Sequence, residues 1–355
     1  MARWFPSFTI SRSTKGELVD SSAKELPELE FGPLQDGDDA RVSDLIMRMS
    51  SDGAGLRLRD KSPEYYRWMY EQNPAGRAIV HSARVGDRIV ASFALAPKIF
   101  VIDGERVVLG KTMDMFTDPA WQGRGLMRSC TDAVFTEAAR AGMPGWYVTP
   151  SVNSYPIFTT RWRYREEFSL IYRLRVLRPR PLRRRLRLPP GYTIEEVQRF
   201  DGSADELWAN EASHGYRVAQ VRDAAYLNWR YVANPDHYDL LTLRRDSRLV
   251  GIAVVATTLR RGIRVGELME LIHGADDEVA LRLLVRAASA RAEGSGCWLL
   301  QAWSVPHTRL DERLRRAGLR WRRGEVKFLL SPGFPGAAAS DPDAWLLSQG
   351  DGNDV

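Results

Sequence analysis

The hydrophobic and polar positions of the chain alternate at strand spacing in some segments and recur at helical spacing in others. Asp103-Gly104 predicts a tight hairpin, and Gly142 with Pro144 predicts the end of a helix. In the first half the pattern predicts strands near residues 29–32, 78–84, 89–98, 99–102, 107–116 and 146–149, and helices near 40–49, 63–71, 126–141 and 154–161. This order of elements favours an α+β fold with a mostly antiparallel sheet.

A short motif occurs once in each half of the chain. Trp68, Tyr70, Asn73 and Pro74 share the spacing Trp-x-Tyr-x-x-Asn-Pro with a second copy that starts at Trp229, 161 positions later. Two strands joined by a tight turn follow in both halves, and later a helix that ends at glycine and a strand that begins with tryptophan. At that last point the offset is 152, so the second half is about nine residues shorter. The repeated order predicts a duplicated domain.

Length and composition agree with two soluble domains. The 355 residues exceed the roughly 250–300 that one core ordinarily supports, and 44% hydrophobic and 27% charged residues are typical of globular proteins. No uncharged run approaches the roughly 18 residues of a membrane span, and the first residues lack the apolar stretch of a signal peptide. We therefore expect a cytoplasmic protein without a membrane partner.

Metal and cysteine chemistry have no support in the sequence. The two cysteines, Cys130 and Cys297, belong to no CxxC or Cys/His cluster, and the five histidines show no HxH or HExxH spacing. Cys130 lies on the apolar face of its predicted helix, which is typical of a core thiol. We expect neither a metal site nor a disulfide framework.

The positive charge of the chain is concentrated in one segment. The net charge is +6, and six arginines fall in a single stretch: Arg178, Arg180, Arg183, Arg184, Arg185 and Arg187. Prolines bracket this stretch, which favours a solvated linker, with a phosphate, RNA or membrane-surface patch as the alternative. We expect an N-terminal extension over 1–27, a first domain over 28–177, a linker over 178–190, a second domain over 191–331 and a tail over 332–355.

A strand, a glycine-containing loop and a helix N-terminus follow one another between Asp114 and Met127. The first turn of a helix offers unbonded N–H groups and the positive end of the helix dipole. Gly123 and Gly125 let the backbone approach a phosphate closely, and Arg124 adds positive charge. The pattern predicts an anion site, and a plain glycine turn entering a helix is the alternative.

These residues resemble the GNAT superfamily of N-acyltransferases. The run Gln122-Gly123-Arg124-Gly125-Leu126-Met127 is similar to its pyrophosphate loop, Gln/Arg-x-x-Gly-x-Gly/Ala, with Met127 in place of the last small residue. The segment from Asn153 to Tyr164 resembles the Asn…Tyr…Gly-Phe segment of the family, although Arg163 replaces the usual glycine and Phe158-Thr159 stands where a tyrosine often serves as acid. The resemblance implies tandem duplicated GNAT-like domains, each a mostly antiparallel mixed sheet flanked by helices.

The resemblance also implies acetyl-CoA, or another acyl-CoA, as co-substrate. The implied contacts are Met115, Phe116, Thr117, Gln122, Gly123, Arg124, Gly125, Leu126, Met127 and Asn153. The second half has Asp276, Asp277 and Glu278 at the position of the phosphate loop, and these carboxylates would repel a pyrophosphate. We therefore expect one active centre, in the first domain.

The reaction implied is direct attack of a primary amine on the thioester, with acetyl transfer to a small molecule or an amino sugar. Backbone N–H groups around residues 115–117 would stabilise the oxyanion. Asp114 is the candidate base or ammonium-orienting group, and the alternative is that it faces solvent or caps a loop. Tyr155 is the candidate acid, with core packing as its alternative, and Asn153 binds cofactor amides or caps a helix.

Two other functions stay open at this point. A Fem-type aminoacyl-tRNA-dependent transferase would use the same double fold, with the arginine stretch on RNA, but such enzymes tend to lack the phosphate loop. A non-catalytic acyl-CoA-binding or scaffold protein would keep the loop without turnover. Nucleic acid is not expected as a partner, and the sequence leaves the oligomeric state and the acceptor open.

Overall fold

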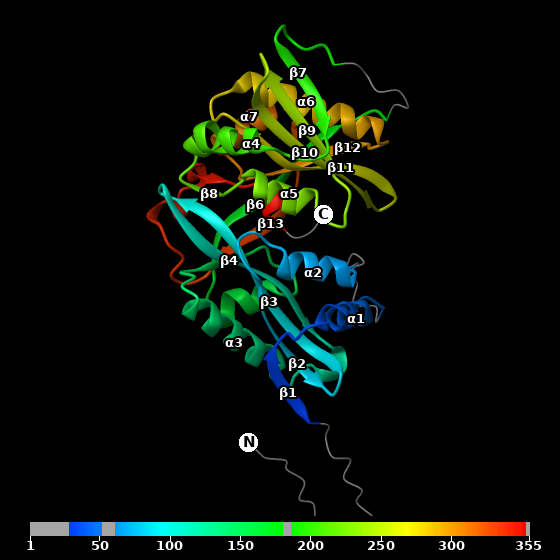
Figure 1. Ribbon diagram of the computed structural model, residues 1–355, viewed down its shortest axis with the longest axis vertical. Coiled ribbons are helices and arrows are strands. Elements are labelled where there is room, and N and C mark those ends of the chain that lie inside the picture. Colours follow the sequence, from blue (N-terminus) through cyan, green and yellow to red (C-terminus); the bar gives the residue numbers. More distant parts are fainter. Residues whose placement is uncertain (1–27, 52–60, 180–185, 353–355) are drawn as a thin grey trace, which may run out of the picture.

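The computed structural model describes residues 28–51, 61–179 and 186–352 (Figure 1). We call residues 28–177 the first half and residues 191–331 the second half. The predicted N-terminal extension, residues 1–27, lies outside the described residues, and so do residues 180–185 of the predicted linker.

The first half begins with the edge strand β1 (Leu29–Pro33) and two helices, α1 (Asp38–Ser51) and α2 (Pro63–Glu71). Ser62 caps α2 by accepting the backbone N–H of Tyr65, and Pro63 occupies the first helical position, where no hydrogen bond is lost. The remaining elements are β2 (Ile79–Val85), β3 (Arg88–Ile102), β4 (Glu105–Thr117), α3 (Leu126–Arg140), β5 (Trp146–Val148), a short π-helix (Ile157–Arg161) and β6 (Arg165–Val176).

The second half repeats this order with one added strand. Asp223 caps α5 (Ala224–Tyr231) as Ser62 caps α2, through the N–H of Tyr226. The elements are β7 (Tyr192–Val197), α4 (Gly202–Leu207), the added strand β8 (Val218–Gln220), α5, β9 (Asp239–Arg245), β10 (Arg248–Arg260), β11 (Ile263–His273), α6 (Glu278–Gly294), β12 (Leu299–Ser304), α7 (Arg309–Arg316) and β13 (Trp321–Leu330). The short strand β14 (Trp345–Leu346) lies in the tail and pairs with β8.

The two halves form one continuous sheet and exchange their last strands. The strand order is β1-β2-β3-β4-β5-β13-β6-β12-β11-β10-β9-β7. Strand β13 of the second half therefore lies beside β5 of the first, and β6 of the first half lies beside β12 of the second. Read from either end, the order is the same: five strands of one half and then the last strand of the other.

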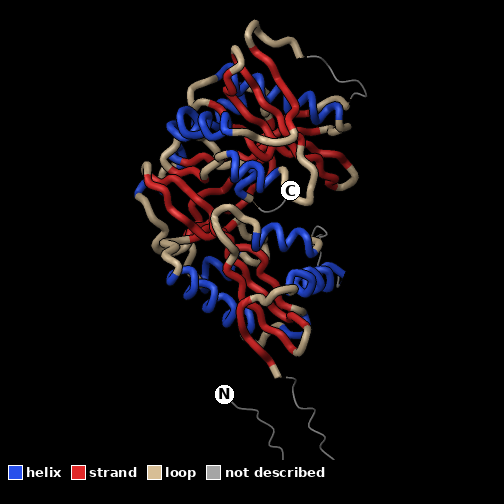
Figure 2. Tube along the Cα trace, in the orientation of Figure 1, coloured by secondary structure: helices blue, strands red, loops and turns tan. Residues whose placement is uncertain are grey.

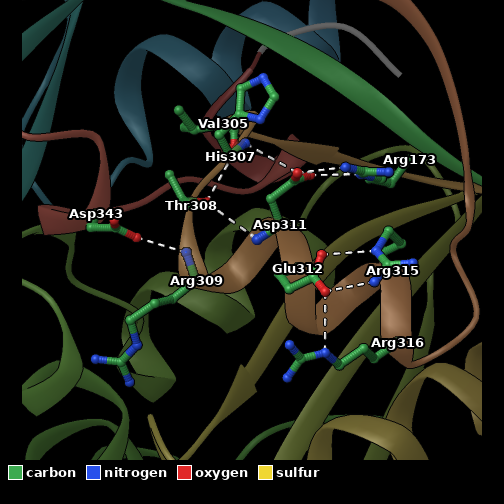
Figure 3. A network of polar contacts seen from close by, with 10 residues as sticks. All are labelled: Arg173, Val305, His307, Thr308, Arg309, Asp311, Glu312, Arg315, Arg316 and Asp343. Carbon is green, nitrogen blue, oxygen red and sulfur yellow. Dashed lines mark hydrogen bonds and ion pairs between the residues drawn. The ribbon is translucent and has the colours of Figure 1, made fainter.

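A buried ion pair fixes one of the exchanged strands. Arg173 on β6 donates to both carboxylate oxygens of Asp311 on α7, with 2.6 Å from Nε to Oδ1 (Figure 3). Thr308 caps α7 by accepting the backbone N–H of Asp311, which fixes the position of that carboxylate. Burial opposes ionisation of Asp311, but the hydrogen bonds from Arg173, Ser304 and the backbone of His307, with the charge of Arg173, together keep the pKa of Asp311 below its ordinary value.

Helices cover both faces of the sheet (Figure 2). Helix α3 packs on β2 and β3 over one apolar cluster, and α6 packs on β9, β10 and β11 over another. A third cluster includes buried residues of α1, α2, α4 and α5 together with strands of both halves. The core is therefore shared where the two helices α2 and α5 meet.

The α+β class and the tandem arrangement predicted from the sequence are confirmed, with local differences. The segments expected as two strands, 89–98 and 99–102, form the single long strand β3. The hairpin forms at the expected dipeptide, because Asp103 and Gly104 both have positive φ, 51° and 90°. The expected helix near 154–161 is short and π-helical from Ile157.

Candidate active site

The predicted anion site lies at the N-terminus of α3. Gly123 and Gly125 adopt φ of 76° and 78°, a left-handed conformation in which a side chain is strained, and Gly125 is the N-cap of the helix. Among the described residues, no oxygen accepts the backbone N–H groups of residues 123–127. The loop is exposed, so these donors point to solvent at the positive end of a 15-residue helix.

Buried charges hold the start of this loop in place. Asp118 is buried, and its carboxylate accepts the N–H of Ala120 at 3.0 Å and contacts the guanidinium groups of Arg48 and Arg88. Gln122 donates from Nε2 to the carbonyl of Thr117 at 3.3 Å, and Arg124 stacks over Trp121 at 4.6 Å. The guanidinium of Arg124 therefore stays beside the helix N-terminus, where it adds to the positive potential.

Strand β4 is open on one side next to the loop. It pairs with β5 only at Gly110–Trp146 and Lys111–Tyr147, so residues 112–117 pair with β3 alone. A β-bulge places Asp114 and Met115 opposite the single residue Phe93, and Asp114 has a φ of 49°. Beyond Lys111, β4 therefore has no paired strand on the side away from β3 among the described residues.

Asp114, the candidate base, is buried beside this bulge rather than facing solvent. Its Oδ1 accepts from Lys61 Nζ at 2.7 Å, and its Oδ2 accepts from the hydroxyl of Tyr70 at 2.9 Å. The exposed fraction of the Asp114 side chain is only 2%. Burial, and then the charge of Asp114, raise the pKa of Tyr70 well above its ordinary value, so Tyr70 stays a donor.

The second half contains the same three-residue arrangement. Glu270 on β11 accepts from Arg222 Nε at 2.8 Å and from the hydroxyl of Tyr231 at 2.8 Å. Arg222 and Tyr231 lie 161 positions after Lys61 and Tyr70, so a cation before the helix, a tyrosine on the helix and a carboxylate on the strand recur as a set. The recurrence indicates that this arrangement stabilises the fold of each half.

Tyr155, the candidate acid, meets a carboxylate that the sequence did not indicate. Its hydroxyl donates to Glu166 Oε2 at 2.6 Å, and this hydrogen bond raises the pKa of the phenol. Glu166 also accepts from Ser169 Oγ and Lys327 Nζ, both at 2.9 Å. Burial opposes ionisation of Glu166, but the hydrogen bonds from Tyr155, Lys327 and Ser169 prevail and lower the pKa of its carboxyl.

The exchanged strand contributes to this second group of residues. Lys327 belongs to β13 of the second half, whereas Tyr155 and Glu166 belong to the first. Tyr155 and Met115 pack against the same apolar cluster, which is formed by Val148, Phe158, Tyr164 and Leu329. The candidate acid therefore lies on the side of the sheet where β4 and β5 separate.

The other predicted cofactor contacts lie on β4, at the start of α3 and in the turn before the π-helix. Met115, Phe116 and Thr117 are half-buried on the open part of β4, Leu126 is buried under the first turn of α3, and Met127 packs against the same cluster as Leu126. Asn153 is exposed in a turn in which hydrogen bonds join Ser151 and Ser154. The structure thus brings the loop, the bulge and Tyr155 to one region of the first half.

The corresponding helix N-terminus of the second half is occupied by the chain itself. Asp277 caps α6, and its Oδ1 accepts the backbone N–H groups of Val279 at 3.0 Å and Ala280 at 2.8 Å. Asp276 pairs with Arg309 at 2.8 Å, and Glu278 pairs with Arg313 at 2.6 Å. A carboxylate of the chain fills the place where an anion would bind.

Comparisons with known proteins agree with this geometry. No family model matches the sequence, and no curated protein matches it. A tandem GNAT protein from the clavulanic acid biosynthesis pathway superposes with a TM-score of 0.59, at 16% identity over 87% of this chain and 100% of that one. Saccharomyces cerevisiae N-myristoyltransferase with bound myristoyl-CoA gives 0.63, at 10% identity over 88% and 86%. A GCN5-related N-acetyltransferase from Kribbella flavida gives 0.54, at 17% identity over 86% and 71%.

Because these sequence identities are low, the structural likeness establishes the fold alone. The chain has the GNAT fold in its tandem form, as the resemblance of the phosphate loop predicted. Within the described ranges, no group of three or more His, Cys, Asp or Glu is placed to hold a metal ion. No helix of the described residues is long and apolar enough to cross a membrane.

Proposed function

We propose that the protein is an acyl-CoA-dependent N-acyltransferase that transfers an acetyl group to a primary amine of a small molecule or an amino sugar. The observation that carries this proposal is the difference between the two helix N-termini. Among the described residues, no oxygen accepts the backbone N–H groups of residues 123–127, which include two glycines with φ of 76° and 78°, whereas Asp277 accepts N–H groups at the N-terminus of α6. The active centre is therefore assigned to the first half.

Acetyl-CoA would lie with its pyrophosphate on residues 122–127 and its pantetheine arm between β4 and β5. The thioester would then reach the bulge, where a backbone N–H of residues 115–117 stabilises the oxyanion of the tetrahedral intermediate. The amine, having lost its ammonium proton to solvent, attacks the carbonyl carbon as the free base. The C–S bond then breaks, the thiolate receives a proton, and the new amide nitrogen releases its extra proton to solvent. Tyr155 is the donor that we assign, because its pKa is raised and the phenol stays protonated near neutral pH.

In this proposal Asp114 does not act as the general base. Both of its carboxylate oxygens are engaged, by Lys61 and by Tyr70. We assign Asp114 to holding the bulge and to orienting the acceptor ammonium through its negative charge. This assignment keeps Asp114 in the site without requiring it to take a proton.

Thermal stabilisation by acetyl-CoA tests the assignment of the cofactor site. A ligand at a hundredfold excess over its Kd should stabilise the fold by about 2.7 kcal/mol. The variant Gly125→Glu should abolish this shift, because a carboxylate then fills the anion site. Gly142→Glu is the matched control: Gly142 lies just beyond the other end of α3, with φ of 79° and open space around it. Asp276→Asn in the second half should also leave the shift intact.

A non-catalytic acyl-CoA-binding protein is the second candidate. The observation in its favour is that the arrangement around Asp114 recurs in the second half, where the phosphate position is filled. Release of free CoA thiol on a panel of primary amines and amino sugars separates the two. Binding of acetyl-CoA without turnover would support the second candidate, and absence of binding would contradict both.

A further inference from the structure

Five large apolar side chains are exposed together at one end of the sheet. They belong to adjacent strands or to the residues that flank them, in the order β13, β6, β12, β11 and β10. The exposed fractions are 66% for Trp321, 63% for Val176, 58% for Trp298, 46% for Ile263 and 71% for Leu259. We call these five residues the apolar row.

The register of the strands places the apolar row across the ends of these five neighbouring strands. Trp321 pairs with Leu174, two residues before Val176, and Trp298 immediately precedes Leu299, which pairs with Val176. Leu299 pairs in turn with Val265, two residues after Ile263. Leu259 is on the other strand of the same hairpin, opposite Arg264. Neighbouring strands are about 4.8 Å apart, so the row extends about 20 Å.

The same end of the first half is covered. There Ile102, at the tip of the β3–β4 hairpin, pairs with Val218 of β8 and is 5% exposed. Residues of the tail, including Ala338, Ala339 and Trp345, pack over this end in one apolar cluster. Trp146, the counterpart of Trp298 in the repeat, is stacked on Phe135 at 4.5 Å. Among the described residues, the end of the second half has no comparable cover over the apolar row.

Arginines surround the apolar row, and carboxylates are scarce. Two grooves beside it are lined by Arg175, Arg187, Arg286, Arg316 and Arg320, with Glu293 as the single acidic residue. Arg261 and Arg264 are exposed at the hairpin tip between Leu259 and Trp298. Of these arginines, Arg316 has an acidic partner, Glu312 on its own helix. Among the described residues, this surface therefore combines protruding apolar groups with an excess of positive charge.

We propose that this face binds to the surface of a bilayer that contains anionic lipids. Tryptophan suits the boundary between headgroups and acyl chains, because its ring is apolar and its N–H is polar. Arginines at the same level are attracted by anionic headgroups, and the aliphatic residues enter the acyl boundary. Such peripheral contact needs no spanning helix. It is independent of the function proposed for the first half.

A nucleic acid fits this face less well. Phosphates would contact the arginines and bases would stack on the two tryptophans, but Val176, Ile263 and Leu259 would stay in water. A lipid surface takes up all five apolar residues and the arginines together. The row crosses the ends of five adjacent strands, which suits a planar partner.

Co-sedimentation with vesicles tests the proposal, using the full chain. We expect binding to phosphatidylcholine vesicles with about 30% phosphatidylglycerol, little binding to phosphatidylcholine alone, and release at about 0.5 M salt, where charges are screened. The double variant Trp298→Ser/Trp321→Ser should lower the bound fraction at least about fivefold, since it removes most of the interfacial anchoring. Arg261→Glu should weaken binding to the anionic vesicles.

Matched variants of the first half serve as controls. Val152→Ser removes a side chain that is 90% exposed, and Arg106→Glu reverses an exposed charge on the β3–β4 hairpin; both should leave binding unchanged. Circular dichroism checks that each variant is folded. Absence of wild-type binding, or equal binding by the double tryptophan variant, would overturn the proposal. So would a dimer that dissociates in the tryptophan variant, or RNA binding that depends on the arginines while vesicles are ignored.

Discussion

Trp68 and Trp229 stack face to face at the joint between the two halves and exchange hydrogen bonds. Their ring centroids lie 5.0 Å apart with an interplanar angle of 21°. Trp68 Nε1 donates to the carbonyl of Trp229 at 2.7 Å, and Trp229 Nε1 donates to the carbonyl of Trp68 at 3.2 Å. The tryptophan of one copy of the motif therefore packs against the equivalent tryptophan of the other copy. Helices α2 and α5 meet there across a pseudo-twofold axis.

Truncation of this pair should be strongly destabilising. Trp68→Ala and Trp229→Ala should each lower the free energy of unfolding by about 3–5 kcal/mol, because both side chains are buried. The double variant should lose less than the sum of the two, by about 1 kcal/mol, since the stacking is lost only once. Denaturant unfolding of the four proteins measures this coupling. Strictly additive losses would contradict a direct energetic contact.

The buried carboxylates on β4 and β11 should both support stability and differ in their effect on activity. Asp114→Asn removes the carboxylate that pairs with Lys61, and Glu270→Gln removes one of the two carboxylates that pair with Arg222, the other being Asp351. Loss of a carboxylate from a buried pair costs up to about 3–5 kcal/mol, and the retained Asp351 should make Glu270→Gln the milder of the two changes. Only Asp114→Asn should also reduce acyl transfer.

The charge-free replacement separates these two effects. Lys61→Met/Asp114→Leu should regain much of the stability, because an apolar pair leaves no buried charge uncompensated. It should not regain activity if the charge of Asp114 orients the acceptor. Thermal unfolding and initial rates measured on the same preparations make the comparison. An Asp114→Asn variant of unchanged stability would show that the arrangement does not support the fold.

Arg163 occupies a backbone conformation that favours glycine. It has a φ of 55°, is exposed, and replaces the glycine that is usual in the GNAT segment that residues 153–164 resemble. Arg163→Gly should raise the free energy of unfolding by about 0.5–1 kcal/mol, because relief of the left-handed strain exceeds the entropic cost of glycine. Arg163→Ala keeps a Cβ atom and should bring no such gain. Chemical denaturation compares the three proteins, and equal stability of the glycine and alanine variants would contradict the prediction.

His273 should make the stability of the fold depend on acidity. Burial lowers its pKa from 6.5 to about 4, and its Nδ1 lies 2.7 Å from the carbonyl oxygen of Gly274. Between pH 6.5 and 4 the imidazole of His273 binds a proton in the unfolded chain but stays neutral in the folded chain. The free energy of unfolding therefore falls as the pH drops from 6.5 toward 4. The loss approaches about 3 kcal/mol. His273→Asn should be less sensitive over this window in unfolding curves taken at several pH values.

Local sequence signals predicted most elements and the anion loop. The turn at Asp103-Gly104 and the glycines at 123 and 125 specify backbone angles by themselves, and all four residues have positive φ. Hydrophobic periodicity placed α2 and α3 within a residue of their observed ends. The repeat at Trp68 and Trp229 predicted the duplication, although it did not indicate that the two copies touch.

Long-range pairings could not be predicted in the same way. The apolar pattern of β6 is the same whether it lies beside β5 or β12, so the strand exchange leaves no local signal. Glu166 joins Tyr155 and Lys327 across separations of 11 and 161 residues and resembles an ordinary exposed strand position. One signal was available for Lys61: the offset of 161 relates it to Arg222, and extending the repeat by seven residues toward the N-terminus would have shown two cations in equivalent places.

Tyr155 provides the most direct test of the proposed chemistry. Tyr155→Phe should lower kcat by about 10²-fold or more with little change in the Kd for acetyl-CoA, because only proton donation to the thiolate is lost. Tyr164→Phe is the matched control, since that phenol is buried in the neighbouring cluster and faces Thr112 at 3.4 Å. Glu166→Gln keeps an acceptor for the phenol but removes the negative charge.

The pH profile of Glu166→Gln then identifies the acid. The hydrogen bond to Glu166 raises the pKa of Tyr155, so the wild-type rate should hold to high pH and fall only as the phenol ionises. Without the carboxylate the pKa of Tyr155 drops, and the alkaline fall of kcat should move to lower pH. Stopped-assay rates across the alkaline range measure this shift. A profile that stays in place, or a Tyr155→Phe variant as active as Tyr164→Phe, would remove Tyr155 from the reaction and leave protonation of the thiolate to solvent.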